Sequence, residues 1–273
     1  MTSSALTTMA EPPPTALQYE ELSPPAHLRD YVACFWQSCA PDQPRQTTIL
    51  PDGCIDLIWQ ADREPFIAGP MTVPAASATS PGTITLGVRF QPGAAAALLG
   101  VSAAELRDST VPLPEIWPRA GQRLSWDRAY AVTDTLSLPR AAAAVHALVR
   151  EATPHDRFIA DACRWLAQHP GEPAAIFVAR SGVSERQARR RFHEHVGYGP
   201  KTLQRILRMQ RVLWLLSRPG PPRSLASLAL AAGYADQAHL TREMRALTGQ
   251  LPTTLVTANP RSAVADLFKT PLA

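Results

Sequence analysis

The fold is decided by a stretch that begins Ala174-Ala-Ile-Phe-Val-Ala-Arg-Ser-Gly-Val-Ser184 and continues Glu185-Arg-Gln-Ala-Arg-Arg-Arg-Phe192. A short apolar helix is predicted to end at a glycine, and a polar residue then caps a second helix. The pattern returns in Ser224-Leu-Ala-Ser-Leu-Ala-Leu-Ala-Ala-Gly-Tyr234, followed by Ala235-Asp-Gln-Ala-His-Leu-Thr-Arg-Glu-Met244. Two helix-turn-helix units in a fixed geometry can reach two adjacent segments of the DNA major groove. The repeat therefore makes DNA binding the leading hypothesis.

The sequence around these units predicts an all-helical domain of about seven helices over residues 153–258. Thr153 and Pro154 are expected to start an amphipathic helix over residues 155–169. Residues 201–217 predict a long helix that joins the two units and spans about 25 Å at a rise of ~1.5 Å per residue. With its flanking helices, this length suits two reading heads that lie one turn of DNA apart, roughly 34 Å.

The first unit carries a basic helix. Ser184 and Gln187 form a capping box, and Ala188 and Phe192 share the face that we expect in the core. The residues predicted on the opposite, DNA-facing side are Arg186, Arg189, Arg190 and His193. A charge run is usually a solvated face, but this one follows a turn motif in a basic half of the chain. Arginine can bind O6 and N7 of guanine with two hydrogen bonds.

The second unit repeats this logic with fewer charges. Asp236 is expected to cap its second helix, with Leu240, Met244 and Leu247 facing inward. The residues predicted to face DNA are Gln237, Ala238, His239, Thr241 and Arg242, with Arg245 assigned to phosphate. Glutamine suits adenine, arginine suits guanine, and an alanine methyl can touch the methyl group of thymine. We therefore expect a lighter reading head here.

The charges of the two halves differ in sign. Residues 1–154 hold 10 arginines and no lysine against 15 acidic residues, a net charge of −5. Residues 155–273 hold 17 basic residues against 8 acidic ones, a net charge of +9. A basic half attracts phosphates through counterion release. The charge pattern thus assigns DNA binding to the C-terminal half.

The N-terminal half predicts a small antiparallel sheet or barrel with flanking helices, which makes the whole chain α+β. We expect a flexible tail over residues 1–17, a sensor or dimerisation domain over 18–152, and a second tail over 259–273. The expected strands cover residues 47–50, 54–59, 65–68 and 83–90, and the expected helices cover 94–99, a segment starting at 101, 121–137 and 138–151. Residues 26–36 fit either a helix or a helix that leads into a strand. The helices over 121–151 either cover the sheet or supply a dimer face.

Residues 155–257 resemble the DNA-binding domain of the AraC/XylS-type transcription regulators. The matching positions are Gly182-Val-Ser184, Arg186, Arg190, Phe192, Gly197, Pro200, Arg208, Leu228-Ala229, Gly233-Tyr234, Asp236, Arg242, Gly249 and Pro252. The chain departs from the pattern at Val178, where a small alanine is usual, at Met244, where phenylalanine is usual, and in the lost ending after Pro252. The resemblance implies that the base-facing residues are Arg186, Arg189, Arg190, Gln237, His239 and Arg242. It also implies a partner in double-stranded DNA, with RNA polymerase and a second copy of the chain as further candidates.

The N-terminal half more faintly resembles a sensor domain that precedes such modules and has no generally assigned ligand. The similar segments are Leu50-Pro-Asp-Gly-Cys-Ile-Asp-Leu57, Ala68-Gly-Pro70, Gly87-Val-Arg-Phe-Gln-Pro-Gly93 and Ala96-Ala-Leu-Leu-Gly100. An apolar effector pocket is expected to be lined by Trp36, Trp59, Phe66 and Phe90, with Asp56 or Arg89 orienting a polar group. The alternative is that these aromatic residues are ordinary core.

Other functional classes have less support. No apolar run approaches the ~20 residues that span a bilayer, and the N-terminus has no signal-peptide pattern, so we expect a cytoplasmic protein. No catalytic set or metal-ligand spacing stands out, so we expect no enzyme activity, no metal and no cofactor. Cys34, Cys39 and Cys54 leave two alternatives open, a thiol sensor and a methyl acceptor in DNA repair. A constitutive DNA-binding dimer without a ligand is a third.

Overall fold

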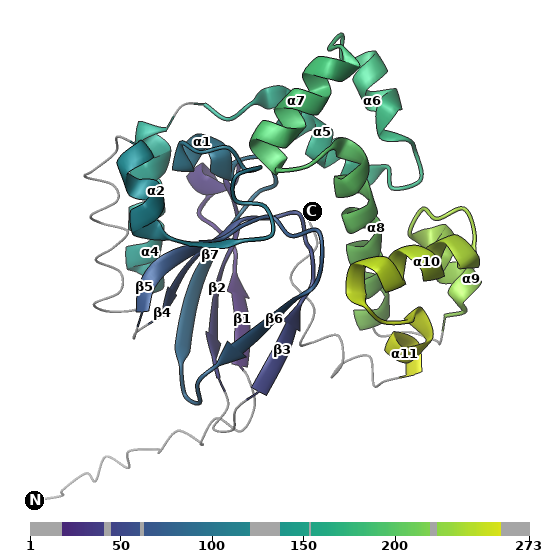
Figure 1. Ribbon diagram of the computed structural model, residues 1–273, viewed down its shortest axis with the longest axis horizontal. Helices are drawn as coiled ribbons and strands as arrows, with labels where there is room; N and C mark the ends of the chain where they lie inside the picture. Colours follow the sequence, from purple (N-terminus) through teal and green to yellow (C-terminus); the bar gives the residue numbers. More distant parts are fainter. Residues whose placement is uncertain are drawn as a thin grey trace, which may run out of the picture.

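The computed structural model describes residues 18–40, 45–60, 63–120, 137–152, 154–218 and 223–257. The chain is α+β, as predicted, with an antiparallel sheet and its helices followed by a helical half (Figure 1). Both predicted tails, and all of the helix predicted over 121–137 except Ser137, lie outside the described residues. None of the described helices is long and apolar enough to cross a membrane.

The main sheet has six strands in the order β1-β2-β7-β4-β5-β8, and every neighbouring pair is antiparallel. Its strands are β1 (Gln18–Leu22), β2 (Val32–Cys39), β4 (Asp56–Gln60), β5 (Arg63–Ala68), β7 (Ile84–Phe90) and β8 (Thr110–Pro112). A separate ribbon pairs β3 (Arg45–Ile49) with β6 (Ala75–Thr79). Trp36 pairs with Gly87, where an added Cβ would lie 2.1 Å from the indole ring. This glycine therefore makes room for the tryptophan.

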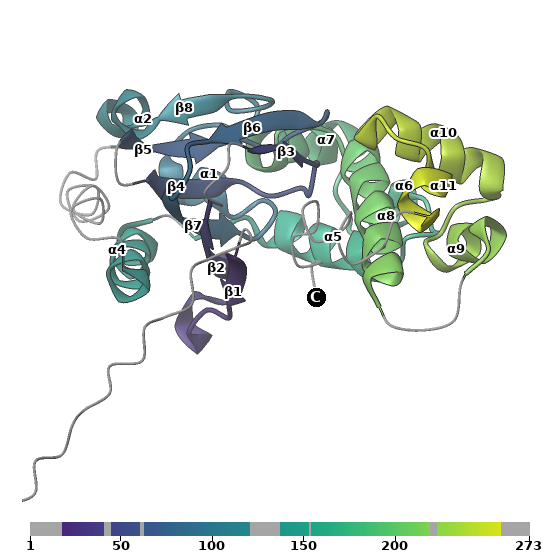
Figure 2. The same cartoon turned by 90° about the horizontal axis from the view of Figure 1, so that it is seen from below.

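Three helices cover one face of the sheet. They are α1 (Ala95–Leu99), α2 (Leu113–Ala120) and α4 (Leu138–Glu151), and they share a core with Leu57, Trp59, Val88 and Phe90. The other face carries Cys34, Trp36, Ile58 and Phe66. The β3–β6 ribbon lies on this second side, away from α4 (Figure 2). The described part of the 121–151 pair, α4, thus covers the sheet.

For residues 26–36 the second alternative is confirmed, since a short 3-10 helix over Ala26–Leu28 leads into β2. Other N-terminal predictions need correction. No helix starts at Val101; Leu106 and Ser109 instead donate backbone hydrogen bonds three residues back in successive turns. Strands β1, β6 and β8 and helix α2 were not predicted.

The C-terminal half contains seven helices among its described residues, in agreement with the prediction. They are α5 (Arg157–Gln168), α6 (Ala174–Arg180), α7 (Glu185–Val196), α8 (Pro200–Ser217), α9 (Leu225–Ala231), α10 (Gln237–Thr248) and α11 (Pro252–Thr257). The long helix α8 lies between α5–α7 on one side and α9–α11 on the other (Figure 1). Thr153, predicted to start the first helix, lies outside the described residues. The N-cap of α5 is Asp156, whose carboxylate accepts the hydrogen bond from the N–H of Ile159.

The two halves are in direct contact. The side-chain amide of Gln210 in α8 donates to the carbonyl of Pro51 over 2.6 Å, and the N–H of Ala103 donates to the carbonyl of Glu194 in α7 over 2.7 Å. Leu50 belongs to the hydrophobic core of the C-terminal half. The bridging helix and the first unit are therefore anchored to the N-terminal sheet.

Candidate nucleic-acid interface

Local hydrogen bonds fix the start of helix α7. The Ser184 hydroxyl accepts from the N–H of Gln187 over 3.3 Å, and the Gln187 side chain accepts from the N–H of Ser184 over 3.1 Å. This is the predicted capping box, formed from both sides. Gly182 turns the chain with a φ of +71°, a conformation that favours glycine. The sequence alone thus determines where the second helix of this unit begins.

The predicted basic face of α7 is largely free of the protein. Arg186, Arg189 and Arg190 are exposed, while His193 is half-buried. Ala188 and Phe192, predicted inward, are each 1% exposed. The structure thus brings the three arginines together on the solvent side of the first two turns.

One arginine of this run has a different place. Arg191 lies 3.5 Å from Asp156, and its guanidinium lies 5.5 Å from the centre of the Phe158 ring. Since Asp156 also caps α5, Arg191 fastens α7 to α5. This contact separates Arg191 from its three neighbours, although all four share one residue type.

The second unit is capped in the same way. The Asp236 carboxylate accepts from the N–H of His239 over 2.6 Å at the start of α10, as predicted. Ser224 accepts from the N–H of Ser227 at the start of α9. An added Cβ at Gly233 would lie 2.5 Å from the backbone of Pro170, so only glycine fits this turn.

The predicted DNA-facing residues of α10 differ in exposure. Gln237, Ala238, Arg242 and Arg245 are exposed. Thr241 is half-buried, and its hydroxyl donates to the carbonyl of Gln237. The solvent-facing set is therefore smaller than the sequence indicated.

His239 is also half-buried, and its ring has local partners. Nδ1 accepts from the N–H of Ala235 over 3.4 Å, Nε2 lies 3.5 Å from Glu243, and the ring packs edge-on against Tyr234. These contacts hold the turn before α10, and base contact by His239 stays a prediction.

An ion pair that the sequence did not reveal joins α10 to α8. The Nε of Arg205 donates to the Glu243 carboxylate over 2.9 Å. Nearby, the guanidinium of Arg208 lies 5.5 Å from the centre of the Tyr234 ring, and Arg211 donates to the carbonyl of Ala231. The arginines of α8 thus fix the second unit on the bridging helix.

The six candidate effector residues do not share one pocket. Trp59 and Phe90 are fully buried in the core between the sheet and the helices. Trp36, Asp56, Phe66 and Arg89 lie on the opposite face of the sheet. Trp59 and Phe90 thus fit the interpretation as ordinary core residues. On the opposite face the structure has a buried polar cluster and not an effector pocket.

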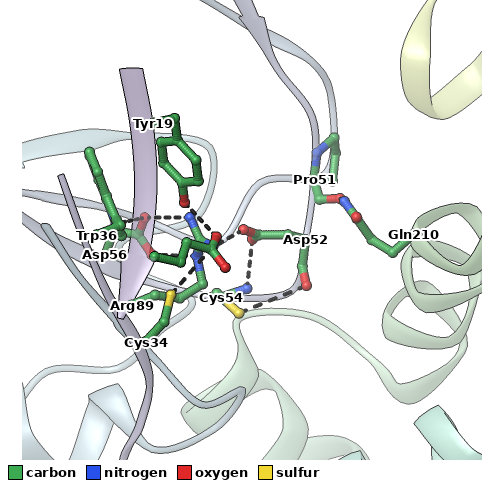
Figure 3. Close-up of polar contacts among 10 residues, drawn as sticks. Tyr19, Cys34, Trp36, Pro51, Asp52, Cys54, Asp56, Arg89 and Gln210 are labelled. Carbon is green, nitrogen blue, oxygen red and sulfur yellow. Dashed lines mark hydrogen bonds and ion pairs between the residues drawn. The ribbon is translucent and has the colours of Figure 1, made fainter. Parts of the chain in front are cut away.

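Figure 3 shows this cluster around Arg89. The guanidinium donates to both carboxylate oxygens of Asp56 over 3.2 Å, and it lies 3.4 Å from Asp52 and 3.1 Å from Glu21. The indole N–H of Trp36 donates to Asp56 over 3.0 Å. Burial alone would lower the pKa of Arg89, but Asp56 and Asp52 outweigh it and raise that pKa, so the group stays charged.

The cysteines are free thiols in largely buried surroundings. Cys34, Cys54 and Cys163 are buried and Cys39 is partly buried. Burial raises the pKa of the Cys54 thiol, helped by Asp52. A reactive cysteine needs a thiolate.

The described residues also hold no group of three or more side chains that could bind a metal ion.

Comparisons with known proteins add family matches to this geometry. Residues 20–112 match a family model described as a domain of unknown function (DUF6597), and residues 177–258 match one described as a helix-turn-helix domain. A search of curated proteins found no match.

Three solved structures are similar to parts or most of this chain at low sequence identity. A probable AraC family transcriptional regulator from Rhodopseudomonas palustris is 22% identical over 38% of this chain and 98% of its own, with a TM-score of 0.35. ToxT from Vibrio cholerae is 8% identical over 93% of this chain and 100% of its own, with a TM-score of 0.44. ToxT bound to (E)-4-(8-methylnaphthalen-1-yl)but-3-enoic acid is 8% identical over 88% and 98%, with a TM-score of 0.44. At these values the structures do not indicate what this chain binds.

Proposed function

We propose that the C-terminal half of this chain, in which residues 177–258 match a helix-turn-helix domain, is an AraC-type double helix-turn-helix DNA-binding domain. The protein is then a sequence-specific transcription regulator controlled by its N-terminal half. The observation that carries the proposal is the exposed trio Arg186, Arg189 and Arg190 on a capped helix. Within the part of the chain that the structure describes, no ion pair compensates these guanidinium groups. Such a row suits a partner that is both anionic and rich in hydrogen-bond acceptors. The major groove of DNA offers both.

In this proposal the two heads have different roles. Helix α7 enters one major-groove segment, where its arginines bind guanine edges and its N-terminus approaches phosphate. Helix α10 enters the next segment, where Gln237 and Arg242 read bases and Arg245 binds phosphate. The Arg205–Glu243 ion pair keeps α10 at a fixed angle to α8. The first head supplies most of the electrostatic attraction, and the second adds sequence preference.

Control would pass through the contact between the halves. Gln210 and Pro51 join α8 to the loop beside the Arg89 cluster, and the Ala103–Glu194 hydrogen bond joins the other side of the sheet to α7. A change in the N-terminal half would therefore shift the helices that carry both heads. A small-molecule effector, a second copy of the chain and RNA polymerase are the partners we propose for this step.

The alternatives have weaker support. The raised pKa of Cys54 keeps its thiol protonated, and both a thiol sensor and a methyl acceptor need a nucleophilic thiolate. A constitutive DNA-binding dimer would need no effector, and its DNA affinity would not respond to any metabolite.

DNA binding of the double variant Arg186→Ala, Arg190→Ala tests the proposal. The full chain selects a duplex from a random library, and fluorescence anisotropy then gives the Kd across a salt series. Each lost base contact costs about 1–3 kcal/mol, so we expect at least a tenfold weaker Kd and a shallower salt dependence. The charge-matched control is the double variant Arg140→Ala, Arg150→Ala, which removes two exposed arginines of α4. An unchanged Kd and slope in the double variant would refute the assignment of α7 to the groove.

A further inference from the structure

A cavity of about 240 Å³ lies between the two halves of the molecule. Its N-terminal wall is formed by Arg29, Asp30, Gln91, Pro92, Gly93 and Ala94. Its other wall comes from the start and one face of α5, with His155, Ala160, Cys163, Arg164 and Ala167. We propose that this cavity binds a small organic carboxylate, which ties the sheet to the DNA-binding half. Binding itself does not depend on the proposed function; its regulatory consequence does.

Contacts on both sides hold the walls in place. The side-chain amide of Gln91 donates to the carbonyl of Arg29, and its N–H donates to the carbonyl of Tyr31 over 2.8 Å. Gly93 has a φ of +84°, and an added Cβ there would lie 2.3 Å from the side chain of Ile159 in α5. The close approach that only glycine allows brings the two walls together beside the cavity.

Charge selects the class of ligand. Arg29 and Arg164 line opposite walls, so one cationic residue from each half borders the same cavity. Within the described residues Arg29 has no ion pair, and Arg164 pairs with Asp161 where both side chains are about 60% exposed. Such exposed pairs contribute little. An anion between the walls would offset the repulsion and bind each guanidinium with charge-assisted hydrogen bonds.

The remaining polar groups refine the choice. Among the described residues the buried Nδ1 of His155 has no hydrogen-bond partner, and the ring packs edge-on against Tyr31. His155 lines the cavity, so its ring can add a hydrogen bond to a ligand there. Burial raises the pKa of Cys163 to about 12, so the thiol stays neutral and does not repel an anion. Asp30 can accept a hydrogen bond from a hydroxyl or ammonium group of the same ligand.

The volume limits the size of the ligand. A cavity of 240 Å³ holds about eight waters at ~30 Å³ each. That space fits a carboxylate of about ten non-hydrogen atoms, such as a dicarboxylate or an amino acid. Since Asp156, which caps α5, also contacts Arg191 of α7, a ligand that holds α5 against the sheet would also hold the first reading head.

Titration of the full chain with malate, glutamate and citrate tests the proposal without DNA. Isothermal calorimetry and thermal unfolding are compared with sodium sulfate at equal ionic strength. We expect saturable binding of at least one carboxylate and a matching rise in Tm. Arg29→Gln and Arg164→Gln should each weaken its Kd at least tenfold, and Ala167→Leu should block it by filling the cavity. Arg150→Gln, an exposed arginine of α4, should bind as the parent does.

Two outcomes would overturn the proposal. One is that no carboxylate binds saturably. The other is that binding lacks specificity, either because sulfate gives the same response as the carboxylates or because Ala167→Leu binds the carboxylate as the parent does. Arg29→Gln changes only an exposed side chain, so it tests the site even if Ala167→Leu fails to fold. DNA binding measured separately keeps the two ideas apart, since a chain that binds the carboxylate but no DNA would contradict only the proposed function.

Discussion

Arg89 is 1% exposed and meets three carboxylates, from Glu21, Asp52 and Asp56. Because side chains alternate along β7, Arg89 lies on the face opposite Val88 and Phe90, which belong to the core between the sheet and the helices. The sequence did not predict that both sides of β7 would be buried, because that depends on tertiary packing on the second face. Burial of an ion pair gains little over an apolar pair, but the loss of one partner leaves the others uncompensated.

We therefore predict that Arg89→Met lowers the free energy of unfolding by about 3–5 kcal/mol. Urea unfolding followed by circular dichroism measures the change. The control is Arg63→Met in the same half. The exposed Arg63 guanidinium lies 4.0 Å from the centre of the Phe66 ring, and its loss should cost about 1 kcal/mol or less. Equal urea midpoints for Arg89→Met and Arg63→Met would contradict the larger contribution of Arg89 to stability.

Among the elements, the capped helices were the best predicted. The Ser184–Gln187 box and the Asp236 cap involve groups three residues apart, so the sequence contains all that they need. Strand β1 was missed because Gln18–Leu22 carries two glutamates, and β6 because Ala75–Thr79 holds alanine and serine, which do not favour strands. Pairing with distant neighbours makes these segments strands. The cap at Asp156 was missed because Thr153-Pro154 offered an equally good local signal.

For the first reading helix we predict that Ser184→Ala lowers the free energy of unfolding by about 1 kcal/mol, since the N–H of Gln187 loses its acceptor. Ser184→Gly should cost only a few tenths, because glycine is also tolerated at this position. Chemical unfolding of the three proteins side by side gives the comparison. An alanine variant as stable as the parent would mean that the capping box contributes nothing to α7.

The predicted domain boundary near residue 153 separates the two halves along the sequence, but in the folded molecule the halves pack against each other. Leu50 lies in the core of the C-terminal half, and an added Cβ at Gly53 would lie 2.9 Å from Leu203 in α8. Contacts between residues 150 positions apart leave no periodic signal in a single sequence. For the same reason the sequence predicted the effector pocket within the N-terminal sheet, whereas the cavity lined by Arg29 and Arg164 lies between the halves.

Buried acids in both halves predict a loss of stability in alkali. Burial raises the pKa of the Cys54, Cys163, Tyr198 and Tyr234 side chains. Below about pH 8.5 the thiols are neutral in both states, and the stabilisation is fully present. Above that pH the unfolded chain releases protons that the folded protein keeps, so the free energy of unfolding falls by about 1.4 kcal/mol per pH unit for each such thiol.

Urea midpoints measured from pH 7.5 to 10.5 check this slope. Cys163→Ala should make the decline shallower, because one of the titrating thiols is then absent from both states. A midpoint that stays constant over this range would contradict the burial of these groups.

The central claim is that two heads on one bridging helix read two adjacent major-groove segments. Methylation interference on a selected duplex tests it most directly, because a methyl group on N7 of guanine blocks the arginine contact. If both heads bind adjacent major-groove segments, two clusters of interfering guanines lie about 10 base pairs apart. Arg186→Ala with Arg190→Ala should remove one cluster, and Arg242→Ala should weaken the other. A single cluster, or interference that both sets of variants change alike, would contradict it.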